Sequence, residues 1–221
     1  MTDNELNTAP KLFYDPKSRA HNDGHLIKGI FATIKAPIKA LKRIGRRLIF
    51  RLRADYTTEQ LVEMGLVVGD NFLRMHGAII DPSHCWHIYI GNNVTLAPRV
   101  PILAHDASLC HHLGYAKIGN VVIGDNVFIG AETVVLPGVT IGDNCIIGAN
   151  STVSRNIPAG SVAVGSPARV VCKVSDYVAR NKKLMQTRPV YGEEYSLRSN
   201  PSMQTRRQMF DDLQDGPGFI V

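Results

Sequence analysis

The stretch "IGDNVFIGAETVVLPGVTIGDNCIIGANSTVSRNIP" (residues 123–158) repeats a six-residue pattern and decides the fold. A large aliphatic residue opens each unit. A second residue, which in most units is smaller than the first, follows four places later. The first set is Ile123, Ile129, Val135, Ile141, Ile147 and Val153, and the second is Val127, Thr133, Val139, Cys145, Ser151 and Ile157.

A period of six excludes a continuous α-helix, because 3.6 residues per turn would scatter residues of this spacing around the helix axis. A short strand followed by a tight turn instead points both sets inward, and glycine beside the aliphatic residue keeps the turn narrow. Three such edges close a coil of about eighteen residues, and stacked coils form a parallel β-solenoid. We therefore predict an all-β solenoid over residues 66–173.

The repeat is interrupted after "IGNNVTLAPRVPILAHDA" (residues 90–107) and resumes at residue 123. From Ile102 to Ile123 is 21 residues, three more than one coil, so we expect three surplus residues to leave the wall as a loop. Imidazole is well suited to act as a general base near pH 7, because its pKa lies near neutrality. A solvated polar loop is the alternative interpretation of the titratable groups here, which are His105, Asp106, Cys110, His111 and His112.

Composition limits the remaining possibilities. The 221 residues, 44% of them hydrophobic, fit one core with appended segments. Residues 25–53 carry nine Lys or Arg and no acid, which leaves 16 bases against 19 acids elsewhere and argues against a general nucleic-acid-binding surface. The four cysteines have no disulfide-framework spacing and no signal peptide opens the chain, so we expect a reducing, cytoplasmic compartment.

The segments outside the repeat differ in character. Residues 1–24 are polar and receive no element, whereas residues 25–65 predict a helical arm with an apolar stripe, a basic opposite face and a kink at Pro37. This pattern is typical of a helix at an anionic membrane surface, which predicts peripheral contact with the inner face of the membrane; the alternative is a stripe packed on the main domain. The stretch "VSDYVARNKKLMQT", in residues 174–221, predicts a short helix. Residues 188–221 are left unassigned, with wrapping around a neighbouring subunit and a loose tail as the two alternatives.

The hexads and the "GSPARVV" exit (residues 165–171) resemble the hexapeptide-repeat acyltransferases, in particular the galactoside/maltose/nodulation-factor O-acetyltransferase branch. The resemblance implies a left-handed β-helix, acetyl-CoA as donor, and a homotrimer with its sites between subunits. A histidine in the corresponding loop is the general base of that family. The resemblance therefore implies His105 as the general base, with His111 or His112 as alternatives. We expect Asp106 to orient the His105 ring.

The family pattern also suggests contacts for acetyl-CoA. Small residues beside the pantetheine arm and positive charge near the nucleotide phosphates are the features carried over. The matching positions are Ala131, Ala149, Ser154, Arg155, Arg169 and Lys173, although a tight turn also accepts the two alanines for structural reasons.

The acceptor is less constrained. We expect Asp81, His84 and Trp86, on the coil before His105, to face a sugar or glycan hydroxyl, including that of a surface polysaccharide precursor. The stretch "FLRMHGA" (residues 72–78) departs from the Asn-bearing "YANFN" of sugar-binding members, so their substrates do not transfer, and serine or an antibiotic is the alternative acceptor.

Two other function classes compete with this interpretation. One is a zinc enzyme of the gamma carbonic anhydrase type, which would bind the metal through histidines. The transferase hypothesis, by contrast, expects no metal. The other is a non-catalytic scaffold or membrane tether. The histidines available to the zinc enzyme are His76, His84, His87, His105, His111 and His112.

Overall fold

The computed structural model describes residues 56–221. The predictions for residues 1–24 and for the basic stretch at 25–53, including the kink at Pro37, lie outside the described residues. The first described helix, α2 (Thr58–Glu63), begins with a capping box, because Thr57 Oγ1 accepts from the Gln60 backbone N–H while Gln60 Oε1 accepts from the Thr57 N–H. Its Leu61 is completely buried.

None of the helices in the described part of the chain is long and apolar enough to cross a membrane.

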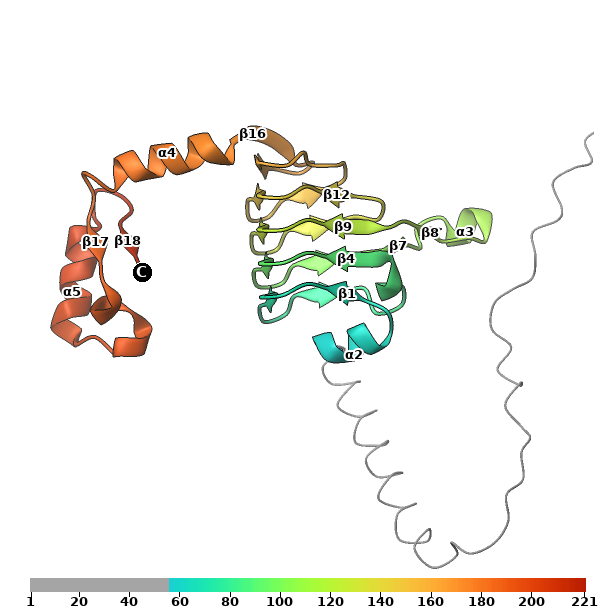
Figure 1. The fold of residues 1–221 in the computed structure, drawn as a ribbon, viewed down its shortest axis with the longest axis horizontal. Helices are drawn as coiled ribbons and strands as arrows, with labels where there is room; N and C mark the ends of the chain where they lie inside the picture. The colour runs from blue at the N-terminus through green and yellow to red at the C-terminus, as the bar shows by residue number, and fades with distance from the viewer. Residues whose placement is uncertain (1–55) are drawn as a thin grey trace, which may run out of the picture. The chain divides into compact units, whose positions relative to one another are not determined.

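Three sheets follow α2, each built from short strands that recur along the chain (Figure 1). All neighbouring strands in them are parallel except the last pair, β15 and β16. Sheet A contains β1 (Val67–Val68), β4 (Ile88–Ile90), β9 (Val121–Ile123) and β12 (Thr140–Ile141). Sheet B contains β2 (Leu73–Arg74), β5 (Thr95–Leu96), β10 (Phe128–Ile129), β13 (Ile146–Ile147), β15 (Ser161–Val164) and β16 (Arg169–Lys173). Sheet C contains β3 (Ile79–Ile80), β6 (Pro101–Ile102), β11 (Val134–Val135) and β14 (Thr152–Val153).

The register agrees with a coil of three edges. Ile123 pairs with Ile141, Ile129 with Ile147 and Val135 with Val153, each pair 18 residues apart on a different sheet. The chain therefore passes through sheets A, B and C in turn before it returns to A. This arrangement of mostly parallel strands fits the predicted β-helix.

Both sets of the six-residue pattern lie inside the coils. The aliphatic set is 0% exposed throughout, and no member of the second set exceeds 4%. Asparagine side chains also connect successive turns: Asn93, at φ 54°, donates through Nδ2 to Asn126 Oδ1 at 3.1 Å. Asparagine tolerates this left-handed backbone better than most residues, so the turn chemistry and the coil stacking agree.

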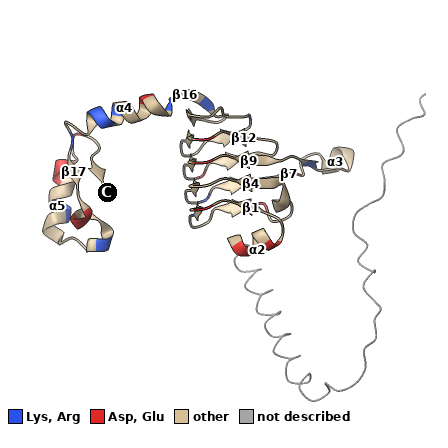
Figure 2. Cartoon of the chain, in the orientation of Figure 1, with Lys and Arg blue, Asp and Glu red and all other residues tan. Residues whose placement is uncertain are grey.

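After β16 the chain forms α4 (Val174–Leu184), within the segment for which a short helix was predicted. Figure 2 shows basic residues on α4, and Lys182 and Lys183 lie in its last turn. Residues 188–221, left unassigned from sequence, fold as β17 (Val190–Tyr191), two 3-10 turns at Glu193–Tyr195 and Leu197–Ser199, α5 (Met203–Asp212) and β18 (Phe219–Ile220). The Arg188 guanidinium closes this segment by donating to the carbonyls of Gly216 and Pro217.

The loop length predicted from the sequence was wrong. Ile102 pairs with Val135, 33 residues later, whereas Val135 pairs with Val153 after 18, so the coil contains 15 surplus residues rather than three. Ile102 and Ile123 lie on different sheets, and counting between them compared positions that do not stack.

Candidate active site

Two insertions lie at the same turn of the coil, between sheets C and A. The first, between β3 and β4, carries the 3-10 turn η1 (Cys85–His87). The second, between β6 and β9, forms a hairpin of β7 (His105–Asp106), α3 (Cys110–Leu113) and β8 (Lys117–Ile118), which projects from the stack (Figure 1). A hydrogen bond of 2.8 Å between His87 Nδ1 and Asn120 Oδ1 joins the two insertions.

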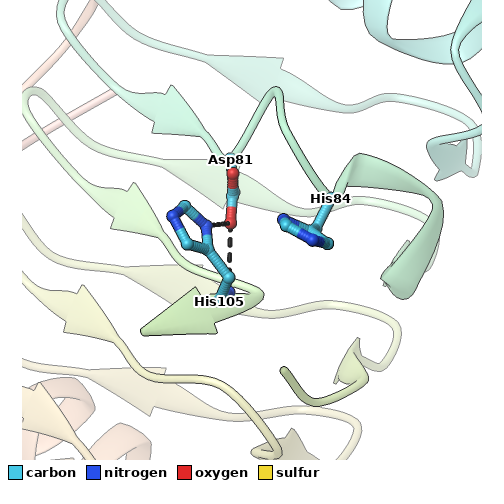
Figure 3. A group of neighbouring side chains, drawn as sticks. All are labelled: Asp81, His84 and His105. Carbon is cyan, nitrogen blue, oxygen red and sulfur yellow. Dashed lines mark hydrogen bonds and ion pairs between the residues drawn. The ribbon is translucent and has the colours of Figure 1, made fainter. Parts of the chain in front are cut away.

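Asp81 connects the insertions at their base. It follows β3 directly, its backbone N–H donates to the Ile102 carbonyl at 2.9 Å, and the residue is only 2% exposed. One carboxylate oxygen, Oδ2, accepts from the backbone N–H groups of Ala104 and His105, both at 3.1 Å. The same oxygen is hydrogen-bonded to Nδ1 of the His105 ring (Figure 3).

The other oxygen of this carboxylate is also satisfied. Ser83 donates to Asp81 Oδ1 from its hydroxyl at 2.7 Å and from its backbone N–H at 3.1 Å. Burial is the largest single influence and acts to raise the pKa of Asp81, but the bonds from His105, Ser83 and Ala104 together outweigh it and lower the pKa. Asp81 is therefore held as a carboxylate.

An ionised carboxylate only accepts hydrogen bonds, so Nδ1 is the protonated nitrogen of neutral His105. Nε2 then keeps its lone pair, and Figure 3 shows this nitrogen on the side of the ring that faces away from Asp81. The His105 side chain is 34% exposed, so it remains partly open to solvent. An imidazole held in this way by a carboxylate is able to act as a base through Nε2.

Asp106 does not have the role expected for it. Its Oδ1 accepts from the Ser108 backbone N–H at 2.9 Å, and its Oδ2 lies 3.8 Å from Lys117 Nζ. The bond from Ser108 is the first cause of a lowered Asp106 pKa. Asp81, which the sequence had suggested for acceptor contact, is the carboxylate that contacts the His105 ring.

The neighbouring histidines divide into two groups. His84 lies beside the Asp81–His105 pair, with Nδ1 at 3.0 Å from Ser83 Oγ and its ring centroid 5.0 Å from that of His105. The centroid of the Trp86 ring lies 5.4 Å from that of His84. The alternative bases, His111 and His112, are exposed on α3 in the projecting hairpin.

Asp81, His84 and His105 also form a cluster of donor atoms. One oxygen or nitrogen from each lies within 4.8 Å of the others, and two imidazoles with a carboxylate are a donor set that zinc accepts. The Asp81 oxygens, however, already accept bonds from His105, Ser83 and the backbone.

The residues expected at acetyl-CoA are distributed over several turns. Ala131 and Ala149 stack at the turn between sheets B and C, where the Asn150 N–H donates to the Ala131 carbonyl at 2.8 Å. Ser154 and Arg155 are exposed after β14, at the same kind of turn that carries His105.

The remaining two cofactor candidates, Arg169 and Lys173, are exposed at opposite ends of β16. Arg169 Nη1 donates to the Ala168 carbonyl at 2.9 Å. The described chain therefore does not bring all six cofactor candidates to one place.

Sequence reasoning missed two residues that connect the site, Ser83 and Asn120. The first, two positions after Asp81, has a recognisable spacing, because a serine there can turn back to an aspartate side chain. The second had no sequence signal, since it binds a residue 33 positions away.

The chain is similar in sequence to known proteins and to a known family pattern. The family model described as "Bacterial transferase hexapeptide (six repeats)" matches residues 120–155. Protein CapG of Staphylococcus aureus is 34% identical over 139 residues, which cover 60% of this chain and 80% of the relative. The chain belongs to the hexapeptide-repeat transferase family. The family expected from the sequence is thereby confirmed.

Other relatives of this hexapeptide-repeat protein match a shorter part of it. Galactoside O-acetyltransferase of Escherichia coli is 39% identical over 112 residues, covering 49% of this chain and 54% of the relative. A solved maltose O-acetyltransferase from Clostridium difficile is 41% identical with a TM-score of 0.42, covering 49% of this chain and 59% of the other. The chain thus spans little more than half the length of several relatives it matches.

Proposed function

We propose that this hexapeptide-repeat protein is an acetyl-CoA-dependent O-acetyltransferase that acetylates a hydroxyl of a sugar or glycan, with His105 as general base. The observation that carries the proposal is the Asp81–His105 pair, which engages Nδ1 and leaves Nε2 free of Asp81 in a partly open site. The named activities of the galactoside and maltose relatives support both the reaction and the class of acceptor.

The chemistry follows from this pair. His105 Nε2 accepts the proton of the acceptor hydroxyl while its oxygen attacks the thioester carbonyl carbon. Asp81 stabilises the resulting imidazolium through Nδ1. Backbone N–H groups are the source of hydrogen bonds to the oxyanion. When the carbon–sulfur bond breaks, His105 returns its proton to the coenzyme A sulfur, which balances the transfer.

A homotrimer of left-handed β-helices is part of the proposal. The cofactor candidates lie on separate turns of one chain, so a groove that contacts them all is best assembled from two neighbouring subunits. Exposed apolar residues on the outer faces of the coils support such packing. Examples are Leu73 and Phe128 on sheet B and Ile79 on sheet C, exposed by 54%, 46% and 44%.

The experiment that tests the proposal is an acceptor screen with the full chain. Acetyl-CoA is incubated with glycosides, serine and aminoglycosides, and released coenzyme A thiol is measured against a reaction without acceptor. Acceptor-dependent thiol release with at least one glycoside is expected, together with its loss in His105→Ala. Coenzyme A binding without transfer to any acceptor would contradict the proposed reaction, and absence of binding would favour the scaffold hypothesis.

The Asp81, His84 and His105 cluster supports a second candidate, a zinc-dependent enzyme. Full acetyl transfer by chelator-treated protein with no detectable metal would exclude it. Transfer that disappears with the metal and returns with zinc would favour it over the metal-free base.

A cytoplasmic location with peripheral membrane contact through residues 25–53 is the last part of the proposal. Full-length protein should bind anionic liposomes more strongly than a variant lacking residues 1–53. Equal binding of the two proteins would contradict this part alone.

A further inference from the structure

The insertion between β3 and β4 carries Trp86, whose backbone is held by buried neighbours while its side chain is exposed to solvent. Cys85, the neighbour of Trp86 in η1, is 0% exposed, and its Sγ lies 3.6 Å from the Leu61 carbonyl. Gly65 approaches so closely that a Cβ added there would lie 2.9 Å from the Trp86 Cβ. Trp86 itself is nevertheless 54% exposed. The insertion therefore holds a large aromatic surface in a defined position facing solvent.

This aromatic surface is close to the proposed base. The Trp86 ring lies 5.4 Å from that of His84, which in turn lies 5.0 Å from that of His105. Two ring contacts thus connect the exposed tryptophan to the catalytic imidazole.

A pocket of about 380 Å³ opens beside Trp86, lined by His87, Tyr89, Asn120 and aliphatic residues of sheet A. This volume is within the range of small-molecule sites. Among the residues that the structure describes, none that lines the pocket is Lys, Arg, Asp or Glu. A zwitterion such as serine would find no charged partner there, so the lining favours a neutral ligand.

The polar groups of the pocket match hydroxyls. The bond of 2.8 Å from His87 Nδ1 to Asn120 Oδ1 makes Nδ1 the donor and leaves His87 Nε2 as an acceptor. The Asn120 amide keeps two N–H donors. A hydroxyl both donates and accepts, so adjacent hydroxyls on one ring can use both groups.

We propose that Trp86, His87 and Asn120 form an acceptor subsite that binds a neutral pyranose ring, with its C–H face on the tryptophan and its hydroxyls on His87 and Asn120. This inference rests on the proposed function and specifies its substrate class. It selects a glycoside over serine, and it assigns the selection to the two insertions that interrupt the repeat.

Fluorescence tests the subsite directly, because Trp86 is the only tryptophan in the 221-residue chain. The full chain is titrated with methyl pyranosides of galactose, glucose and N-acetylglucosamine, and with serine and sorbitol as comparisons. A saturable change in tryptophan emission is expected with at least one pyranoside and not with serine or sorbitol. No change with any pyranoside, or the same change with serine, would overturn the proposal.

The same titration with His105→Ala separates this subsite from the proposed reaction. The fluorescence change should persist in that variant, because binding on Trp86 does not require the base. If no acceptor is acetylated but the change persists, the proposed function fails while the subsite stands. If acetylation proceeds and the fluorescence does not respond, the subsite fails alone.

Kinetics with the glycoside that gives turnover provide the second measurement. Trp86→Ala should raise KM for the glycoside about tenfold. Trp86→Phe should have a KM close to that of the wild type, because it keeps an aromatic face. KM for acetyl-CoA should not change. Phe210→Ala is the matched control, since Phe210 is 63% exposed on α5 and does not line the pocket. An unchanged glycoside KM in Trp86→Ala would overturn the assignment.

Discussion

Nδ1 of His105 is hydrogen-bonded to Oδ2 of Asp81, a buried carboxylate 24 residues earlier in the chain. This bond sets the ring orientation and the tautomer, and it joins two successive coils at the turn where both are interrupted. The proposed chemistry depends on this relationship more than on any other contact, because it decides which nitrogen can accept a proton.

Asp81→Asn should lower kcat by roughly 10²- to 10⁴-fold, because an amide that donates to Nδ1 would favour the wrong tautomer. Steady-state kinetics with acetyl-CoA and the best glycoside measure the effect. Asp106→Asn is the matched control, since Asp106 bonds to Ser108 rather than to the ring, and its kcat should change little. Equal losses in the two variants would contradict the assignment of Asp81.

Acid should remove a stabilising contribution of Asp81. The pKa of Asp81 is lower in the folded chain than its ordinary value of 3.8. The ionised carboxylate therefore stabilises the folded protein at pH values above 3.8, and this contribution is lost as the pH falls through the lower folded pKa. Urea unfolding of the wild type and Asp81→Asn at about pH 7 and about pH 3 measures it. The difference between the two proteins should narrow at the lower pH, and a difference independent of pH would show that ionisation of Asp81 contributes nothing.

Adjacent residues of β13 should differ in their contribution to stability. Ile147→Ala should cost about 2–5 kcal/mol, because Ile147 is 0% exposed and its removal leaves a cavity between stacked coils. Ile146→Ala in the same strand should cost clearly less, since Ile146 is only partly buried. Equilibrium urea unfolding compares them, and similar costs would contradict the inward and outward assignment.

The four cysteines should react in the order of their exposure. Cys110 is exposed on α3 and Cys172 is intermediate, whereas Cys85 and Cys145 are buried and burial raises the pKa of both thiols. A disulfide reagent should therefore modify Cys110 first in the native protein, and Cys85 and Cys145 only after denaturation. Mass spectrometry of the labelled peptides identifies the order. Early labelling of Cys145 would contradict the packing of its coil.

Much of the fold follows from the six-residue pattern, because the pattern recurs along the chain. Ile141 and Cys145 are buried because each edge has the same strand and turn, so one correct hexad predicts the others. The interrupted coil has no such rule. Its length became clear only from the pairing of Ile102 with Val135, because insertions change spacing without changing which residues stack.

The candidate site divides in the same way. His105 could be proposed from the sequence, because one titratable residue type suits the proposed reaction and it follows a break in the pattern. The carboxylate that contacts its ring could not, because Asp106 is adjacent in sequence whereas Asp81 is adjacent in space, on the previous coil. Side chains that meet across coils depend on register, and the first two coils are offset by 22 residues rather than 18.

The measurement that tests the proposed mechanism most directly is turnover by His105→Ala, compared with His112→Ala from the exposed α3 and with the wild type. We expect kcat to fall by about 10²- to 10⁴-fold in His105→Ala only, with coenzyme A still raising the melting temperature of all three proteins. Wild-type turnover in His105→Ala, or an equal loss in His112→Ala, would contradict the assignment of His105 as the base.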